Sequence, residues 1–240
     1  MVSTDNTGSE ILKVISGANR FNFWMYQTIK PHIKGNTLEI GSGIGNLSSF
    51  FLNDNISITL SDTETEYIDI LNKRFSGHKN LKSIVSINLE HSSFEDTYPE
   101  MKEKFETVFL LNVLEHIKDD KLAIRNILFL LKPGGTILIL SPAYSFLFSD
   151  LDRALGHHRR YTKDGLKTLL SESDFIPLKS FYFNFMGIIA WLYGKILRLK
   201  TIPAGEMSLF NRLVPIGTFI DKIVFRKAGL SVIIVAKKIN

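Results

Sequence analysis

Five short apolar runs recur along the first 141 residues, and longer segments with helical spacing separate them. Each run is nearly continuous in Leu, Ile and Val, with little alternation of apolar and polar positions. Such runs are typical of parallel strands that helices cover on both faces. The predicted strands are 37–40, 56–61, 83–87, 107–111 and 136–141.

The C-terminal half begins with the same pattern and then departs from it. Residues 119–131 predict a helix that Pro133 and Gly134 end. A polar, basic connection at 142–163 leads to a helix at about 163–172 and a strand at 177–183. The 46 residues from 184 to 229 are too long for an ordinary loop. The β-branched residues 230–236 predict a last strand.

Composition narrows the class of protein. The chain is 45% hydrophobic and 22% charged, which excludes a disordered or collagen-like chain. It has no cysteine, so disulfides, thiolate zinc sites and a cysteine nucleophile are excluded. Residues 1–150 carry 14 basic and 18 acidic side chains and residues 151–240 carry 15 and 6, so the formal net charge changes from −4 to +9. The two parts therefore face different partners.

The sequence predicts neither a signal peptide nor a membrane span. Residues 1–10 lack a basic start followed by an apolar run. The uncharged stretch 180–194 is 15 residues long, whereas a spanning helix needs roughly 20 apolar residues. We therefore expect a cytoplasmic protein.

The first predicted strand runs into a loop with three alternate glycines, Gly41, Gly43 and Gly45. Glycine lets the backbone approach a ligand closely. A dinucleotide site would need Gly or Ala where the chain has Asn46. Glu39 precedes the glycines and would oppose the charge of a pyrophosphate. The loop therefore suits a cationic or zwitterionic ligand.

An acidic residue follows the second predicted strand. Asp62 lies 21 residues after Gly41, where a carboxylate in this topology can accept hydrogen bonds from ribose hydroxyls. The glycine loop and Asp62 together describe a site for a nucleoside without phosphates.

Four segments together resemble the class I S-adenosylmethionine-dependent methyltransferases. The glycine loop matches the family's Glu-x-Gly-x-Gly-x-Gly motif in full. Residues 58–62 resemble its ribose-binding second strand, 112–117 its motif after the fourth strand, and 131–135 the turn before its fifth strand. The segment Gly-His-His-Arg-Arg-Tyr at 156–161 resembles a bacterial subgroup that carries Gly-His-x-Arg-Arg-Tyr there.

The resemblance implies an α/β, Rossmann-like fold. Its sheet would have seven mostly parallel strands with the last strand antiparallel, flanked by helices, with a helical insertion before the last strand. Residues 1–240 would form one methyltransferase domain. Its parts would be an N-terminal helical cap at 1–35, a cofactor-binding core at 36–183, a helical substrate-side insertion at 184–229 and the last strand at 230–240.

The resemblance also implies S-adenosyl-L-methionine as the cofactor. The glycines would border its methionine portion, Asp62 its ribose and the segment around Asn88 its adenine, although family members often have Asp at that position. A helix before the first strand could add contacts, or its aromatic face could simply pack on the sheet. The expected cofactor-binding residues are Arg20, Trp24, Glu39, Gly41, Ser42, Gly43, Gly45, Asp62, Asn88, Leu89 and Asn112.

Methyl transfer is an in-line displacement, so an enzyme mainly aligns the acceptor and, for a hydroxyl, removes its proton. The cluster at 152–161 follows the fifth strand and offers both functions. His157 or His158 would be the general base, with His157 preferred, and Arg159 and Arg160 would clamp an anionic group. Alternatively, the arginines pair with nearby acids in a solvated loop. Further candidates are Tyr161 and His116 for catalysis and Tyr144 for acceptor contact, and no metal site is expected.

We expect methylation, at oxygen, of a small-molecule or lipid- or glycan-like acceptor. The aromatic and basic segment 181–200 could cover an apolar acceptor, lie against a membrane surface, or pack within the protein. If it touches a membrane, the protein would lie at its inner face. Nucleic-acid methylation is an alternative that the +9 charge favours, but the Asn/Asp/Ser-Pro-Pro-aromatic motif is missing after the fourth strand. A non-catalytic cofactor-binding module is the other alternative, and the oligomeric state is left open.

Overall fold

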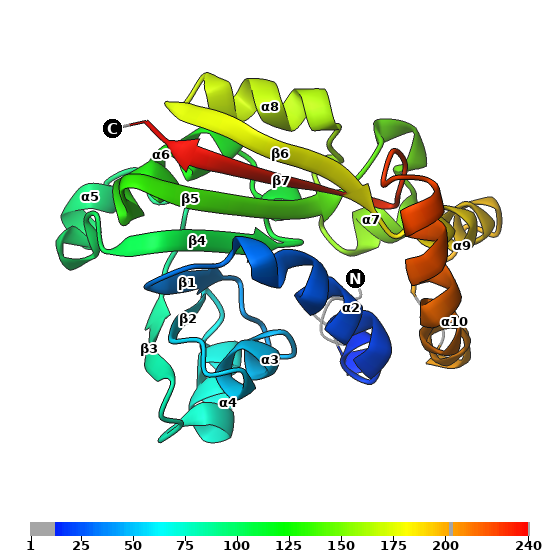
Figure 1. Ribbon diagram of the computed structural model, residues 1–240, viewed down its shortest axis with the longest axis horizontal. Helices are drawn as coiled ribbons and strands as arrows, with labels where there is room; N and C mark the ends of the chain where they lie inside the picture. Colours follow the sequence, from blue (N-terminus) through cyan, green and yellow to red (C-terminus); the bar gives the residue numbers. More distant parts are fainter. Residues whose placement is uncertain (1–12, 202–203, 240) are drawn as a thin grey trace.

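The computed structural model describes residues 13–201 and 204–239. Seven strands form one sheet in the order β3-β2-β1-β4-β5-β7-β6 (Figure 1). The first five strands are parallel, and β7 runs antiparallel to both of its neighbours. This confirms the predicted seven-stranded sheet. The strands are β1 Thr37–Ile40, β2 Ile58–Asp62, β3 Leu81–Ser86, β4 Phe105–Leu111, β5 Leu131–Pro142, β6 Phe175–Phe183 and β7 Ser231–Lys238.

The central strands divide their side chains between two hydrophobic cores. In β4, Val108 and Leu110 face one core and Phe109 faces the other, and β5 alternates in the same way. Both faces are apolar because successive side chains of a strand point to opposite faces and both are covered. This explains why the strands read as continuous apolar runs in the sequence.

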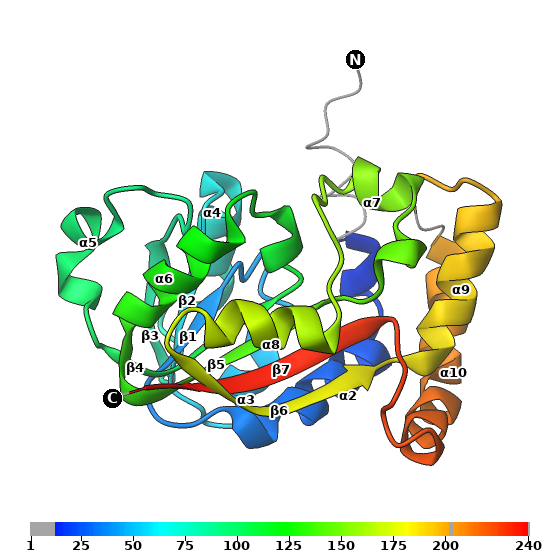
Figure 2. The same cartoon turned by 90° about the horizontal axis from the view of Figure 1, so that it is seen from above.

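Helices cover the two faces of the sheet. The core on one face includes side chains of α5, α6 and α8, and the core on the other includes side chains of α2, α3, α4 and α10. Figure 2 shows α6 and α8 on one side of the sheet and α2 and α3 on the other. The helices are α2 Asn19–Ile29, α3 Ser48–Asn53, α4 Thr65–Phe75, α5 Phe94–Thr97, α6 Asp120–Leu130, α7 Asp150–Ala154, α8 Lys163–Ser171, α9 Phe185–Ile196 and α10 Ala204–Ile223.

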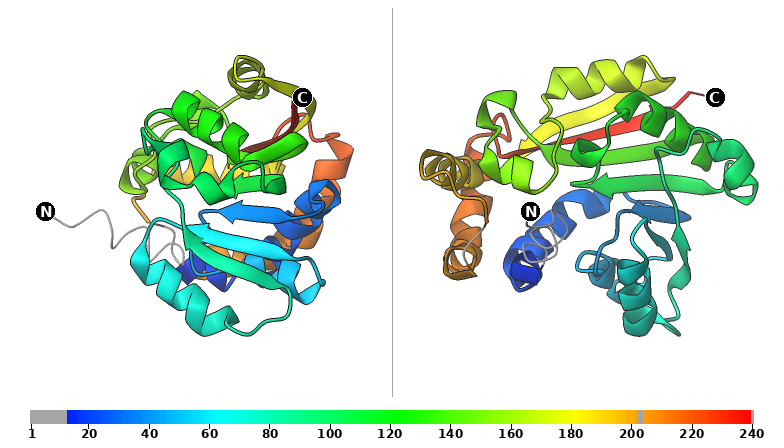
Figure 3. Two further views of the ribbon diagram at one scale, coloured as in Figure 1. Left: turned by 90° about the vertical axis from the view of Figure 1, so that its left-hand side faces the viewer. Right: turned by 180° about the vertical axis from the view of Figure 1, so that it is seen from behind.

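The segment between β6 and β7 forms the helices α9 and α10, which stand together at one end of the molecule (Figure 3). Asn184 caps α9, because its Oδ1 accepts a hydrogen bond from the Gly187 amide at 2.9 Å. The buried Asp221 of α10 accepts hydrogen bonds from the amides of Asn184 and Phe185 at 2.8 Å and so joins the two helices. Within the described ranges, no helix combines the length and apolar content needed to traverse a bilayer.

Two parts of the predicted organisation lie partly outside the described residues. They are residues 1–12 of the N-terminal cap, which include the segment compared with a signal peptide, and residues 202–203 of the insertion. Most predicted strand ends shift by one or two residues, and the largest change is at the start of β5. β5 begins at Leu131, directly after α6, because Leu131 pairs with Phe105 of β4 ahead of a register shift. The helix therefore ends at Leu130, before the Pro-Gly-Gly segment, which lies within the strand.

The parallel strands place several loops at one edge of the sheet. Chain segments that leave the carboxyl ends of β1, β2, β4 and β5 meet there, which is where ligands bind in open α/β sheets. The glycine loop, Asp62 and the histidine-rich segment all follow one of these strands. The fold therefore brings the predicted site residues to a common edge.

Candidate functional site

The glycine loop is held between two neighbouring segments. Gly41 has φ of +70°, and a Cβ added there would lie 2.4 Å from Cγ2 of Val113, in the segment after β4. Gly45 has φ of +78°, and its Cβ would lie 2.3 Å from Cε2 of Phe75 at the end of α4. Both the backbone angle and the close packing require glycine at these positions. The loop is therefore fixed from two sides.

Asp62 lies against this loop. Its Oδ2 accepts a hydrogen bond from the Gly43 amide at 2.8 Å, and its Oδ1 accepts one from the Glu64 amide at 3.1 Å. The carboxylate is buried and joins the end of β2 to the glycine loop after β1. An acceptor at this place fits the hydroxyls of a ribose, so the residues present fit a nucleoside ligand.

A second buried carboxylate, Glu39, lies in β1 below the loop. It accepts a hydrogen bond from the hydroxyl of Ser48 at the start of α3. Burial raises the pKa of Glu39 to about 7, because desolvation outweighs the Ser48 and Ser42 hydrogen bonds and Asp62 adds like charge. Ser42 fastens the loop to β2, since its amide donates to the Ser61 carbonyl at 2.8 Å. Glu39 and Ser42 thus shape the loop from beneath.

The other predicted cofactor residues after the strands lie along the same edge. Asn88 is exposed and its Oδ1 accepts a hydrogen bond from the Glu90 amide at 2.9 Å. The neighbouring Leu89 is buried. Asn112 is exposed, has φ of +53°, and donates its amide hydrogen to the Leu140 carbonyl at 2.8 Å.

The two residues predicted on α2 have different surroundings. Trp24 is buried against Phe183, with ring centroids 4.4 Å apart, and its ring lies 3.5 Å from where a Cβ of Gly217 in α10 would be. Its indole therefore packs between β6 and α10. This agrees with the alternative that the aromatic face of this helix packs on the sheet. Arg20 is exposed, and within the described ranges it forms no ion pair or hydrogen bond.

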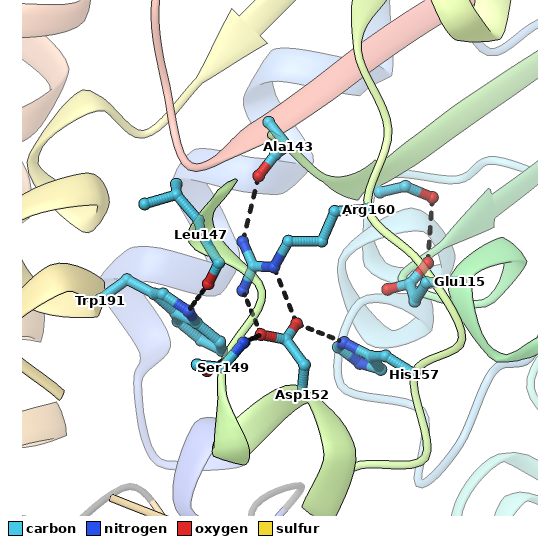
Figure 4. A network of polar contacts seen from close by, with 9 residues as sticks. Glu115, Ala143, Leu147, Ser149, Asp152, His157, Arg160 and Trp191 are labelled. Atoms are coloured by element: carbon cyan, nitrogen blue, oxygen red, sulfur yellow. Dashed lines mark hydrogen bonds and ion pairs between the residues drawn. The ribbon is translucent and has the colours of Figure 1, made fainter. Parts of the chain in front are cut away.

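The histidine-rich segment brings His157 to a buried carboxylate (Figure 4). Nδ1 of His157 lies 2.9 Å from Oδ1 of Asp152 in α7. The His157 side chain is 6% exposed and that of Asp152 is fully buried. Since a carboxylate only accepts, Nδ1 carries the hydrogen, and in the neutral imidazole the lone pair is on Nε2. His158 is exposed and donates its amide hydrogen to the Glu115 carbonyl at 2.8 Å.

Arg160 corrects one prediction. Its guanidinium is fully buried and donates from Nε to Oδ1 of Asp152 at 2.8 Å and from Nη2 to Oδ2 at 3.1 Å. Nη1 donates to the Ala143 carbonyl at 3.2 Å, and the group lies 4.3 Å from the ring centroid of Trp191. All of these contacts are internal, so the prediction that Arg160 binds the acceptor is wrong. Figure 4 shows how this network surrounds Asp152.

Arg159 and Tyr161 also have internal partners. Arg159 donates to Asp120 at 2.7 Å and to the Lys118 carbonyl at 2.6 Å. The buried hydroxyl of Tyr161 donates to Asp120 at 2.9 Å. Burial and the Asp120 charge raise the pKa of Tyr161, which makes its phenolate a less accessible base. Asp120 thus holds the Tyr161 hydroxyl in place, whereas Arg159, whose side chain is 35% exposed, stays a candidate for acceptor contact. The pairing of Arg159 with Asp120 is close to the ion-paired alternative.

Glu115 and His116 lie beside His157. From the sequence, His116 was predicted only as a further candidate, and Glu115 was not among the candidates. They form a short 3-10 helix, Leu114–His116, directly after β4. The rings of His116 and His157 meet edge to face with centroids 4.6 Å apart. Glu115 is fully buried and accepts a hydrogen bond from Ser141 Oγ at 3.0 Å. His116 and His157 are 41 positions apart in the sequence, so their contact depends on the fold. The sequence offered one indication of this site, the Glu-His pair directly after a strand.

Burial changes the protonation of this pair. The pKa of Glu115 is raised to about 8, first by desolvation and then by the charge of Asp152, against the lowering effects of its own backbone amide, Ser141 and Arg160. The pKa of His116 is lowered to about 4, because surrounding groups desolvate its ring and His157 and His158 add like charge. His116 is therefore neutral at pH 7 and offers a lone pair.

Tyr144, the remaining acceptor candidate, begins the connection after β5. It has φ of +63° and stacks on Tyr182 of β6, with centroids 4.8 Å apart and rings 26° from parallel. Burial raises its pKa to about 12, and Tyr182 adds to the effect. It is half-buried and stays a candidate for an apolar contact.

Comparison with known proteins shows what the chain is similar to. Residues 38–137 match the family model described as a methyltransferase domain. The fold resembles that of phosphoethanolamine N-methyltransferase 2 from Haemonchus contortus, solved in complex with S-adenosyl-L-methionine, with a TM-score of 0.63 and 16% identity over 94% of this chain and 57% of that one. It also resembles a SAM-dependent methyltransferase from Archaeoglobus fulgidus, with a TM-score of 0.57 and 17% identity over 90% and 94%. The fold is that of the class I enzymes.

Two curated relatives each match less than half of this chain. The ubiquinone biosynthesis O-methyltransferase of Xanthomonas campestris pv. campestris is 30% identical over 102 residues, which cover 42% of this chain and 41% of the relative. The probable polyketide synthase 41 of Dictyostelium discoideum is 27% identical over 128 residues, 47% of this chain and 5% of the relative. The chain thus spans less than half of these relatives. It carries a match to a methyltransferase domain and the fold of a methyltransferase that was solved with S-adenosyl-L-methionine.

Proposed function

We propose that the chain transfers a methyl group from S-adenosyl-L-methionine to a hydroxyl oxygen of a small-molecule or lipid-like acceptor. The observation that carries this proposal is that two groups of site residues lie next to each other. The glycine loop and Asp62 form one group, and Val113, which packs on Gly41, joins them to the second group, Glu115, His116 and His157. Ligand binding and proton removal thus meet at one edge of the sheet.

The chemistry of the first group fits a positively charged nucleoside. Asp62 supplies the acceptor for ribose hydroxyls, and backbone glycines allow close approach of the methionine portion. Asp62 and Glu39 place acidic groups where a pyrophosphate would be repelled. The bound cofactor supplies the electrophilic methyl group, and these residues hold and orient it.

His157 is the residue that we assign to proton removal. Asp152 holds its Nδ1–H, as an orienting carboxylate does for a catalytic imidazole. Its Nε2 is free to take the proton of an acceptor hydroxyl as the new oxygen–carbon bond forms and the sulfur–carbon bond breaks. Arg160 keeps Asp152 ionised and in place.

The helices next to this site support the proposed acceptor class. Trp191 of α9 donates to the Leu147 carbonyl at 3.0 Å, so α9 adjoins the segment that carries α7. Apolar side chains remain exposed on both α9 and α10, together with basic residues of the same segment. An apolar acceptor delivered from a membrane surface suits this arrangement, and we propose peripheral membrane contact through 181–200 and α10.

The proposal is tested with His157→Asn, which can still donate a hydrogen bond to Asp152 but has no basic nitrogen. S-adenosylhomocysteine affinity, measured by calorimetry, should stay near wild type. The initial rate of methyl transfer, measured with a panel of phenolic and polyprenyl hydroxyl acceptors, should fall on the order of 100-fold or more. His78→Asn, at the amino end of β3 on the opposite edge, is the matched control. An unchanged rate in His157→Asn, or failure of the wild type to bind S-adenosylhomocysteine, would refute the proposal.

A further inference from the structure

We propose that Glu115, His116 and His157 form a binding site for one divalent transition-metal cation, of which Zn²⁺ is the preferred example. One ligand atom of each residue lies within 4.8 Å of the other two. Two imidazole nitrogens and one carboxylate oxygen form a familiar catalytic set of protein ligands, with a position left for a water or substrate oxygen. The site needs no residue outside the described part of the chain.

The geometry requires only small movements. A cation equidistant from three atoms 4.8 Å apart lies about 2.8 Å from each, and ligand bonds of roughly 2.0 to 2.2 Å are normal for such a cation. The side chains would therefore close by less than about 1 Å. His116, on the exposed side, leaves the cation accessible, while Glu115 forms the floor.

An unpartnered carboxylate oxygen points to a missing ligand. Glu115 is 0% exposed, and while Oε2 accepts from Ser141, Oε1 accepts no hydrogen bond within the described ranges. Buried polar atoms are almost always satisfied, and an orphaned one calls for an explanation. Figure 4 shows the Glu115 carboxylate on the same side of the network as His157. A cation between the two satisfies Oε1.

Asp152 prepares His157 for this role. Because Nδ1 donates to Asp152, the lone pair is on Nε2, the atom left for a metal. Metal-bound histidines almost always donate their other ring hydrogen to a carboxylate or carbonyl, which fixes the ring and its tautomer. Asp152 is itself fixed by Arg160 and by the Ser149 amide and hydroxyl. The carboxylate that would orient His157 is therefore already in place.

The chemical use of the cation rests on the proposed methyl transfer. A metal-bound acceptor hydroxyl has a lowered pKa and gives its proton to water, after which its oxygen bonds the methyl group and the sulfur–carbon bond breaks. With the cation bound, Nε2 of His157 is a metal ligand and no longer the base assigned above, and the cation takes over activation of the hydroxyl. Val113, two residues before Glu115, already contacts Gly41, so the cation lies near the methionine side of the cofactor residues.

The test is metal binding by chelator-treated protein. Calorimetry with Zn²⁺ should give one site per chain, and Co²⁺ should give visible d–d absorption bands typical of four- or five-coordinate nitrogen and oxygen ligation. Glu115→Gln and His157→Asn should each weaken binding on the order of 100-fold or more. His78→Asn, which removes a histidine at the opposite edge of the sheet, should bind like wild type.

The outcomes separate this inference from the proposed function. Absence of a Zn²⁺ site in the wild type, or a site that neither Glu115→Gln nor His157→Asn weakens, overturns the metal inference. S-adenosylhomocysteine affinity is measured on the same samples, and its retention in both variants shows that they are folded. If the metal site is absent but S-adenosylhomocysteine binds, only this inference fails. If the metal binds but S-adenosylhomocysteine does not, the proposed function fails.

Discussion

Glu39 is a carboxylate that the fold keeps away from water. It lies in a central strand and touches a hydroxyl at the start of α3, so its ionised form is poorly solvated. A raised pKa means that the folded chain binds this proton more tightly than the unfolded chain does. The stability from this group is therefore full below the unfolded pKa of about 4.5 and is lost as the pH rises through about 7.

We therefore predict a pH-dependent effect of Glu39→Gln, which does not titrate. Between pH 5 and pH 8 the free energy of unfolding of the wild type should fall relative to the variant, by up to about 3 kcal/mol. Urea unfolding at both pH values measures the difference. The exposed Glu66→Gln in α4 is the control and should show no such trend. A constant difference between wild type and Glu39→Gln would contradict the buried carboxylate.

Gly41 allows a second prediction at the scale of one residue. Gly41→Ala should destabilise the chain by about 2 to 4 kcal/mol, because it adds both a strained positive φ and a methyl group against Val113. Gly77 has a similar φ of +81° but nothing within 4 Å of its Cβ position. Gly77→Ala should therefore cost only about 1 kcal/mol, for the backbone alone. If both variants lose the same free energy of unfolding in urea, the Val113 side chain can move aside at little cost.

At the scale of elements, α9 and α10 each keep an apolar stripe that no described part of the chain covers. Exposed positions recur at helical spacing, which is the pattern of a face and not of scattered residues. Basic side chains of the same segment offer charge that complements anionic lipid. The exposed apolar residues are Ile189, Leu192, Tyr193 and Ile196 in α9 and Leu209, Ile216, Phe219 and Ile223 in α10.

This arrangement predicts a vesicle-binding defect in Ile196→Asp. Ile196 is 78% exposed, so the change should leave unfolding nearly unaffected while it removes apolar area and adds negative charge at the proposed contact. Sedimentation with phosphatidylglycerol vesicles should show affinity several-fold below wild type. Ile176→Asp makes the same change at a position 52% exposed on the edge strand β6 and should bind normally. If wild type, Ile196→Asp and Ile176→Asp bind vesicles equally, α9 does not take part in the membrane contact.

At the scale of the whole molecule, the uneven charge matches the division of the chain. The acidic part, 1–150, contains the strands and loops of the proposed nucleoside site, and the basic part, 151–240, contains α9 and α10. The acidic side suits a cationic ligand, and the basic side suits an anionic acceptor or surface. One chain can therefore present opposite electrostatic preferences to its two substrates.

The resemblance to the class I methyltransferases implied the antiparallel last strand. The sequence by itself determined the approximate positions of the strands and the glycine loop. These depend on local signals: apolar runs of strand length, helix stop residues, and glycines at positions where backbone angles exclude other residues. Such signals act between residues that are near in sequence. This is why β1 begins and ends where predicted, while β5 gains residues from its pairing with β4.

Only the tertiary structure decided what the charged residues of the histidine-rich segment do. Arg160 and Tyr161 looked available because the sequence does not show that Asp152, Ala143 and Asp120 enclose them. His157 gained neighbours from the segment after β4, which parallel pairing of β4 with β5 brings to the same edge. Side-chain partnerships over such separations depend on packing, because burial makes any unpaired charge costly and so selects the partner that the fold supplies.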